Sequence, residues 1–344
     1  MCSVASAPSR TSRRVGSMQL SCGVFPGPDS VEHAKIAEGL GYERIWLYDS
    51  PALYEDIYVH LALAAQATST VGLGTAVLIP HLRHPMTTAA AIATIARLAP
   101  DRFVAGFGTG FTGRLVMDQR PLPWAYMETY LRQLVALLDG EVVEIDGRPC
   151  QMIHHPDLAA PRPILVPVVV SAFGPRGQGV ARDIGAAGVM SIGAVEGFDW
   201  SIQMVNGTVL DPGEDLSTPR VRDAAGPWFA VMYHHMWHGG DPTVVDGLPG
   251  GTEWRTAVEA ERPEGERHLV VHEGHCSHVT DRDRPLLDVE GSLFGQGMGW
   301  IGTADEVRAQ AEAAVAAGAT ELLYTPTGPD IPRELTAFRA ALLP

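Results

Sequence analysis

Short apolar runs alternate with longer segments of helical periodicity along most of the chain. The runs QLSCGVF, YERIWLYDS, VGLGTAVLIP, DRFVAGFGTG, PILVPVVVSA and GVMSIG have the length and composition of strands. Because they are apolar without strict alternation, they are expected to be buried on both faces, as in a parallel sheet covered by helices. The segments between them predict helices at 31–41, 56–70, 86–98, 124–138 and 174–188.

This alternation breaks between residues 196 and 265, which are rich in Gly, Pro, Trp and His and predict one helix near 220–235. It resumes with RHLVVHEG as a predicted seventh strand and TELLYTP as an eighth, each with a helix after it. Eight strands alternating with helices predict an α/β fold, a (β/α)8 TIM barrel with a large insertion after strand 6. A doubly wound sheet is the alternative.

The same pattern sets the expected domain organisation. Residues 18–344 are expected to form a single barrel domain, with an insertion at about 197–265 capping the active site. Residues 1–17, MCSVASAPSRTSRRVGS, have no apolar core segment and predict a flexible N-terminal tail. Residues 141–152 predict a hairpin, with Asp146 and Gly147 at its turn.

The composition narrows the classes of function. The chain has 344 residues, with 25 Lys and Arg against 40 Asp and Glu and a net charge of −15. An acidic chain without a basic cluster is not expected to bind nucleic acid. No apolar run approaches the roughly 18 residues of a membrane span. The four cysteines form no CxxC pair, so we expect a cytoplasmic protein. Since neither nucleic acid nor a membrane is an expected partner, we expect the protein to act on a small molecule.

The chemistry of a TIM barrel lies at the carboxyl ends of its strands. After the fifth predicted strand, SAFGPRGQG leads into a helix, with Arg176 in its first turn. Glycines allow a phosphate to approach the backbone closely, and a helix N-terminus favours an anion. The stretch predicts a site for a cofactor phosphate, although an ordinary strand-to-helix turn also uses glycines in this way.

Two other loops of the same edge carry weaker signals. AGFGTGF lacks the third glycine of a dinucleotide fingerprint. VLIPHLRHP offers His81, Arg83 and His84, which suit an anionic or ring-shaped ligand. In the alternative interpretation, His84 caps the next helix and Arg83 is a solvated surface group.

Histidines gather late in the chain, at His234, His235, His238, His272, His275 and His278. HEGHCSH lacks the HExxH spacing that places two imidazoles on one helix face, so no metal site is expected. We expect these histidines to form hydrogen-bonded loops, with one or two of them lining a substrate pocket. No Ser-His-Asp set or GxSxG elbow is evident, which leaves a hydrolase with little support.

Taken together, several stretches resemble the luciferase-like flavin or deazaflavin oxidoreductases. They are AEGLGYERIWLYDS, the block from LALAAQATSTVGLGTAVLIPHLRHP to DRFVAGFGTG, VVVSAFGPRGQGVARDIGAAG and IGTADEVRAQAEAAVAAGATELLYTPTGPD. LGTAVLIPHLRHP is most similar to members that use coenzyme F420, including methylene-tetrahydromethanopterin reductases and sugar-phosphate dehydrogenases. The resemblance therefore implies F420 as the cofactor, with FMN as the alternative, and a homodimer.

The resemblance also implies roles for individual residues. Asp49 would lie beside the cofactor ring, and Ala76 and Val77 would form a bulge behind it, commonly with a cis peptide bond. The expected cofactor-binding residues are Asp49, Ala76, Val77, Thr109, Gly110, Ser171, Ala172, Phe173, Gly174 and Arg176. The expected catalytic residues are Tyr48, Asp49 and His81, and the expected substrate pocket is lined by Phe111, Trp124, His234 and His235.

The sequence departs from the family pattern at Ser50, where a histidine is common, and at Phe111, where some sugar-phosphate dehydrogenases carry an acid. Sugar-phosphate oxidation is therefore disfavoured, because it needs a base at these positions. The first hypothesis is hydride transfer between F420 and a small organic substrate. The alternatives are an FMN-dependent monooxygenase that uses O2, a barrel that binds a ligand without turnover and, last, a metal hydrolase.

Overall fold

The computed structural model of the protein describes residues 18–155, 157–297 and 299–342. Eight parallel strands close into a barrel in the spatial order β1-β12-β9-β8-β7-β4-β3-β2. The barrel strands are β1 (Gln19–Val24), β2 (Arg44–Leu47), β3 (Gly72–Thr75), β4 (Phe103–Phe107), β7 (Val168–Ser171), β8 (Gly188–Ser191), β9 (Ser201–Val205) and β12 (Glu321–Tyr324). The predicted (β/α)8 barrel is confirmed, and the closed order excludes an open doubly wound sheet. The predicted tail, 1–17, lies outside the described residues.

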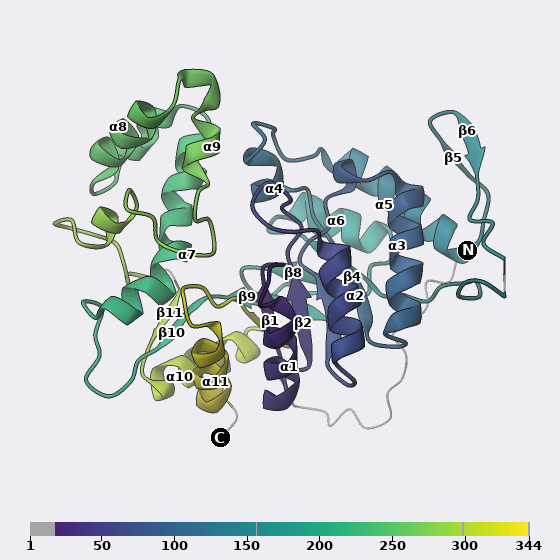
Figure 1. The fold of residues 1–344 in the computed structure, drawn as a ribbon, viewed down its shortest axis with the longest axis horizontal. Coiled ribbons are helices and arrows are strands. Elements are labelled where there is room, and N and C mark those ends of the chain that lie inside the picture. The colour runs from purple at the N-terminus through teal and green to yellow at the C-terminus, as the bar shows by residue number, and fades with distance from the viewer. Residues whose placement is uncertain (1–17, 156, 298, 343–344) are drawn as a thin grey trace. The chain divides into compact units, whose positions relative to one another are not determined.

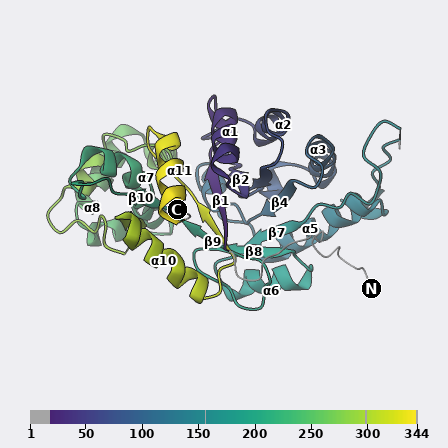
Figure 2. The same cartoon turned by 90° about the horizontal axis from the view of Figure 1, so that it is seen from below.

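Helices follow the strands largely where the apolar periodicity places them. Figure 2 shows α1, α2 and α3 side by side on the outside of the early strands, with α5 and α6 further along the barrel. The predicted hairpin is also present, as β5 (Val143–Ile145) paired with β6 (Arg148–Cys150). The helices named here are α1 (Ser30–Leu40), α2 (Ile57–Ala67), α3 (Pro85–Leu98), α4 (Phe111–Leu115), α5 (Trp124–Asp139), α6 (Pro175–Asp183), α10 (Ala304–Ala316) and α11 (Ile331–Leu342).

The described chain forms two compact units. The first runs to Phe111 and also contains Pro121–Met204 and Ala314–Leu323, so it holds nearly all of the barrel. The second is made of Thr112–Arg120, Val205–Ala313 and the described residues from Tyr324 onward. The predicted capping of the active site by the insertion stays a prediction.

A buried carboxylate joins the strands at which the barrel closes. Glu321, at the start of β12, has no exposed surface. It accepts hydrogen bonds from Arg44 Nη1 at 3.1 Å, from Trp46 Nε1 at 3.2 Å and from Trp200 Nε1 at 2.8 Å. The Arg44 guanidinium also lies 5.3 Å from the Trp46 ring and 4.9 Å from the Trp200 ring. A buried charge is tolerated when it is paired and hydrogen-bonded in this way.

The second unit is mainly helical. Its long helix α7 (Pro219–His238) lies with α8 (Gly251–Glu261) and α9 (His268–Val271), as Figure 1 shows. Aromatic side chains fill its core: the Phe229 and Tyr233 rings are 5.7 Å apart, and the Tyr233 and Trp254 rings are 6.0 Å apart. A short parallel pair, β10 (Gly207–Val209) and β11 (Trp300–Gly302), belongs to the same unit.

The prediction of the seventh strand was wrong. RHLVVHEG forms α9 and the turn after it, and the seventh barrel strand is β9, within the region predicted to be an insertion. The long segment that interrupts the alternation therefore follows the seventh strand and not the sixth, between β9 and β12. The run HLVV is too short for its periodicity to separate helix from strand. The SIQMV run of β9 carries polar residues, which hid its strand character.

The sequence predicts that no apolar run is long enough to span a membrane. Among the described residues, no helix combines the length and the apolar character needed to cross a bilayer.

Glu38, near the end of α1, fixes the turn that leads into β3. Its Oε1 accepts hydrogen bonds from the backbone N–H of Ser69 at 2.8 Å, of Thr70 at 2.5 Å and of Val71 at 3.0 Å. Burial by itself raises the pKa of this carboxyl, but the backbone donors outweigh it and lower the pKa to about 2. The carboxylate form of Glu38 therefore stabilises the fold.

This hydrogen bonding predicts a pH dependence of stability. Because the folded pKa lies below the unfolded one, the stabilisation is present above about pH 4.5 and is lost as the pH falls toward 2. Over that interval the free energy of unfolding should fall by on the order of 1 kcal/mol more in the wild type than in Glu38→Gln. Urea unfolding at several pH values measures this difference, and equal losses in the two proteins would contradict it.

Candidate functional site

The carboxyl ends of β2, β3, β4 and β7 are neighbours on one rim of the barrel, because these strands are consecutive in the parallel sheet. The register aligns Leu47 with Thr75, and Leu78, beyond β3, bridges to Phe107 of β4. The segments predicted to bind the cofactor follow these strand ends directly. The structure therefore places these residues at the end of a strand or on the loop directly after it, on four adjacent strands: Asp49, Ala76, Val77, Thr109, Gly110, Ser171, Ala172, Phe173 and Gly174.

Behind this rim, the loops after β3, β4 and β7 meet in close contact. The Ala76–Val77 peptide bond is cis, as the resemblance implied. A Cβ atom at Gly108 would lie 2.5 Å from Cγ2 of Val77 and 3.6 Å from Cβ of Ser171. Only glycine permits this approach, and the sequence analysis did not single out Gly108.

The strongest ionic contact of the rim joins Asp49 and Arg83. Arg83 Nη1 donates to Asp49 Oδ2 at 2.6 Å, and the two side chains are 16% and 2% exposed. Nη2 of the same guanidinium donates to Asp56 at 3.2 Å. Burial raises the pKa of the Asp49 carboxyl, and the Arg83 guanidinium opposes that rise. Arg83 is thus the partner of Asp49 and not a solvated surface group.

Aromatic side chains hold Arg83 in place. Its guanidinium lies 5.1 Å from the Tyr58 ring, and the Tyr130 hydroxyl hydrogen-bonds to the Arg83 carbonyl at 3.0 Å and to Thr88 Oγ1 at 2.6 Å. Burial raises the pKa of Tyr58 and raises that of Tyr130 to about 12, so both phenols are neutral at physiological pH. The side chains that hold Arg83 beside Asp49 are therefore uncharged.

Two other predicted residues have local partners. The Tyr48 hydroxyl donates to the Gly23 carbonyl at 2.8 Å, which ties the ends of β1 and β2 together. His84 accepts the Met86 N–H at 3.1 Å and caps α3, as the alternative interpretation expected. His81 lies in the short turn η1 (Pro80–Leu82), partly buried.

The turn from β7 into α6 is the most open of the predicted segments. No side chain caps α6 among the described residues, and a Cβ atom at Gly174 would meet nothing within 4 Å. Phe173 is 58% exposed, and Arg176 is exposed as well. Uncapped N–H groups beside open space suit an anion such as a phosphate.

The predicted substrate-pocket residues are divided between the two units. Trp124 packs on α6, where a Cβ at Gly177 would lie 2.2 Å from its indole. Phe111, at the start of α4, is 38% exposed. His234 and His235 belong to α7 of the second unit, and His234 is buried against His275. Their contact with a substrate stays a prediction.

Burial also changes the pKa of three histidines of the second unit, His235, His272 and His275. It lowers the pKa of His272 and of His275, and the neighbouring histidines lower both values further. His235 also has a pKa lowered by burial. At neutral pH His272 and His275 are neutral imidazoles, each with one ring nitrogen able to accept.

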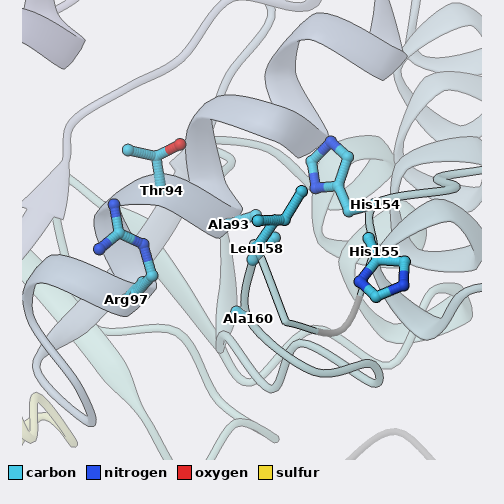
Figure 3. A pocket seen from close by; sticks show the side chains of 8 residues that line it. Ala93, Thr94, Arg97, His154, His155, Leu158 and Ala160 are labelled. Carbon is cyan, nitrogen blue, oxygen red and sulfur yellow. The ribbon is translucent and has the colours of Figure 1, made fainter.

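A pocket of about 330 Å³ lies away from the strand ends, on the outside of the barrel. Figure 3 shows Thr94 and Arg97 of α3 facing it, opposite the loop that carries His154 and Leu158. None of the residues predicted to form the site lines this pocket.

Comparison with known proteins identifies the family to which the chain belongs. The luciferase-like monooxygenase family matches residues 4–321, and the chain belongs to that family of oxidoreductases. A 5,10-methylenetetrahydromethanopterin reductase of Archaeoglobus fulgidus is 22% identical over 332 residues, covering 91% of this chain and 94% of the relative. An F420-dependent glucose-6-phosphate dehydrogenase of Kineococcus radiotolerans is 28% identical over 336 residues, covering 91% of each chain.

A solved structure shares the fold. The coenzyme F420-dependent tetrahydromethanopterin reductase of Methanopyrus kandleri aligns with a TM-score of 0.63 and 18% identity, covering 96% of this chain and 99% of the other. The resemblance drawn from the sequence is confirmed at the level of family and fold.

The Asp49–Arg83 pair predicts a defined loss of stability. Arg83→Ala leaves a buried carboxylate without its cation, and the free energy of unfolding should fall by about 3 kcal/mol at neutral pH. The loss should shrink as the pH falls, because burial raises the pKa of the Asp49 carboxyl and the protonated group has no buried charge. Denaturant unfolding at neutral and at acidic pH tests this.

Asp56→Asn is the matched control. It removes only the exposed half of the Arg83 contacts, since the Asp56 side chain is 52% exposed, and asparagine still caps α2. Its cost should stay below about 1 kcal/mol. Equal losses in the two variants would show that the buried pair has no special weight.

Proposed function

We propose that the protein is an F420-dependent oxidoreductase that transfers a hydride between the deazaflavin and a small organic substrate. One observation carries the proposal: the open turn between β7 and α6 shares a rim with the Val77–Gly108 contact and with Asp49. Relatives that cover most of the chain include an F420-dependent dehydrogenase. When bound, the cofactor supplies the hydride chemistry at its ring.

The rim fits such a group at both of its ends. The turn at 171–174 leaves open space at Gly174, and the start of α6 has no side-chain cap, which suits the phosphate, with Arg176 nearby as a positive charge. Ala76 and Val77 would support the ring from behind, and Thr109 and Gly110 would follow the chain between ring and phosphate. Glycine at 108 keeps Val77 and Ser171 close together.

Asp49 and Arg83 would act as a fixed pair beside the ring. Arg83 already occupies Oδ2 of Asp49, so the carboxylate is held in one orientation and its remaining lone pairs can accept hydrogen bonds. A group held in place by its neighbours orients a ligand without a further entropic cost. We assign the proton that accompanies hydride transfer to His81 or to Tyr48, whose hydroxyl would have to leave the Gly23 carbonyl to deliver it.

A reduced-FMN monooxygenase that uses O2 is the second candidate, because the family is named for that activity. The two cofactors would share the phosphate turn and the ring support. Ser50 occupies a position where a histidine is common in the family, and Phe111 occupies one where some sugar-phosphate dehydrogenases carry an acid. A substrate other than a sugar phosphate is therefore proposed. A homodimer and a cytoplasmic location stay predictions.

Cofactor titration tests the proposal. Purified protein should bind F420 at least about tenfold more tightly than FMN, as measured by fluorescence. The reduced F420 complex should not consume oxygen. Preference for reduced FMN with oxygen uptake would establish the monooxygenase instead, and failure to bind either cofactor would overturn both candidates.

Gly174→Val tests the phosphate turn within the same assay. The fold has room for the side chain, which would take up only the open space at the turn. Affinity for F420 should fall at least about tenfold. Gly179→Val is the matched control, because Gly179 lies on the same helix and is also open within 4 Å. If the Gly174→Val variant binds F420 as tightly as the control variant, the phosphate does not bind at this turn.

A further inference from the structure

Three buried histidines of the second unit converge from two separate segments. His234 lies on α7, whereas His272 and His275 lie in the turn that follows α9. Their exposed fractions are 1%, 2% and 3%. One nitrogen from each of the three rings lies within 4.8 Å of the other two. Polar rings collected at such depth require a common partner or a complete hydrogen-bond network.

The turn after α9 brings two of these rings together. His275 N–H bonds back to the His272 carbonyl at 3.2 Å, so residues three apart face the same side. Gly274 has a φ of 71°, and a Cβ there would lie 2.5 Å from the His278 carbonyl. Glycine is therefore required for the turn. The turn places the His272 and His275 rings on the same side, although the segment is not helical.

The distances between the inner nitrogens are those of ligands on one ion. Nδ1 of His275 lies 3.1 Å from Nδ1 of His234 and 3.5 Å from Nδ1 of His272. Two imidazole nitrogens bound to a tetrahedral zinc at about 2.0–2.1 Å stand about 3.3–3.4 Å apart. Two of the three pairs of rings thus already have close to the ligand spacing that zinc requires, and all three offer nitrogens within 4.8 Å of one another.

The outer nitrogens of the same rings face oriented partners. Nε2 of His275 lies 3.0 Å from Thr112 Oγ1, and Nε2 of His272 lies 3.2 Å from Nδ1 of His238. Nε2 of His234 points toward Asp283 Oδ1 at 3.6 Å. Metal-bound histidines are commonly held by such contacts at the nitrogen that does not bind the metal.

Asp283 supplies a buried negative charge next to the cluster. Its side chain is 2% exposed, and it accepts hydrogen bonds from Trp254 Nε1 at 2.7 Å and from Thr280 Oγ1 at 2.8 Å. Within the described chain, no ion pair joins it to an arginine or a lysine. A divalent cation beyond His234 would provide the missing countercharge.

We propose that His234, His272 and His275 bind a divalent transition metal of the zinc class through their Nδ1 atoms. Water fills the remaining coordination position. Imidazole nitrogens favour zinc and similar ions, whereas magnesium and calcium prefer oxygen ligands. The ion joins α7 to the turn after α9 and stabilises the second unit. None of these three histidines is among the residues assigned to the cofactor. The proposed site therefore does not depend on the identity of that cofactor.

The test uses the full chain, purified without a polyhistidine tag and freed of metal with a chelator. Equilibrium dialysis against zinc, followed by elemental analysis, should find about one zinc per chain. His234→Asn and His275→Asn should each reduce binding at least about tenfold, and zinc should raise the unfolding temperature of the wild type and of the control variant but not of these two variants. His278→Ala is the control, because that histidine is exposed and lies three residues from His275.

Cobalt substitution of the wild type keeps the proposal falsifiable if the buried variants fail to fold. A Co²⁺ complex with three imidazoles and one water should give the visible absorption of a tetrahedral site, and X-ray absorption on the zinc form should show nitrogen ligands at about 2.0 Å. Binding of less than about a tenth of an ion per wild-type chain would overturn the site. Equal loss in His278→Ala and His275→Asn, or an octahedral cobalt spectrum, would do the same.

Discussion

The closure of eight parallel strands is the constraint on which the rest of the molecule depends, and Glu321 is the group that joins the closing strands. With no exposed surface, it binds Arg44 of β2 and the indoles of Trp46 and Trp200. A buried ion pair with additional hydrogen bonds fixes geometry even when its net energy is modest. Closure brings every carboxyl end to one rim, and residues far apart in sequence meet there.

On that rim, two glycines leave space for close contacts or for a ligand, and one ion pair provides charge. Gly108 allows the loops after β3, β4 and β7 to touch, and Gly174 leaves open space at the start of α6. Asp49 and Arg83 provide fixed charge at the end of β2. A long, planar ligand with an anionic tail matches this distribution: apolar support in the middle, a polar pair on one side and free N–H groups on the other.

The barrel could be predicted because its strands are apolar runs at regular spacing, and β7 through VVVS is a clear example. The seventh strand could not, because SIQMV of β9 has a weaker pattern than HLVV, which became α9. The positions of Asp49 and of Ala76–Val77 came from family resemblance, whereas the pairing of Arg83 with Asp49 spans 34 residues and required the fold. The convergence of His234 with His272 and His275 required the fold for the same reason: the sequence showed the three histidines without a metal-binding spacing, and His234 joins the other two only through tertiary packing.

A crystal structure of the protein with bound F420 tests the central claim most directly. The account predicts electron density for the cofactor phosphate within hydrogen-bond distance of the backbone N–H groups of Phe173, Gly174 or Arg176, with the ring against Ala76 and Val77 and beside Asp49. Density for the cofactor anywhere else, or a ring that does not touch the loops after β2 and β3, would contradict it.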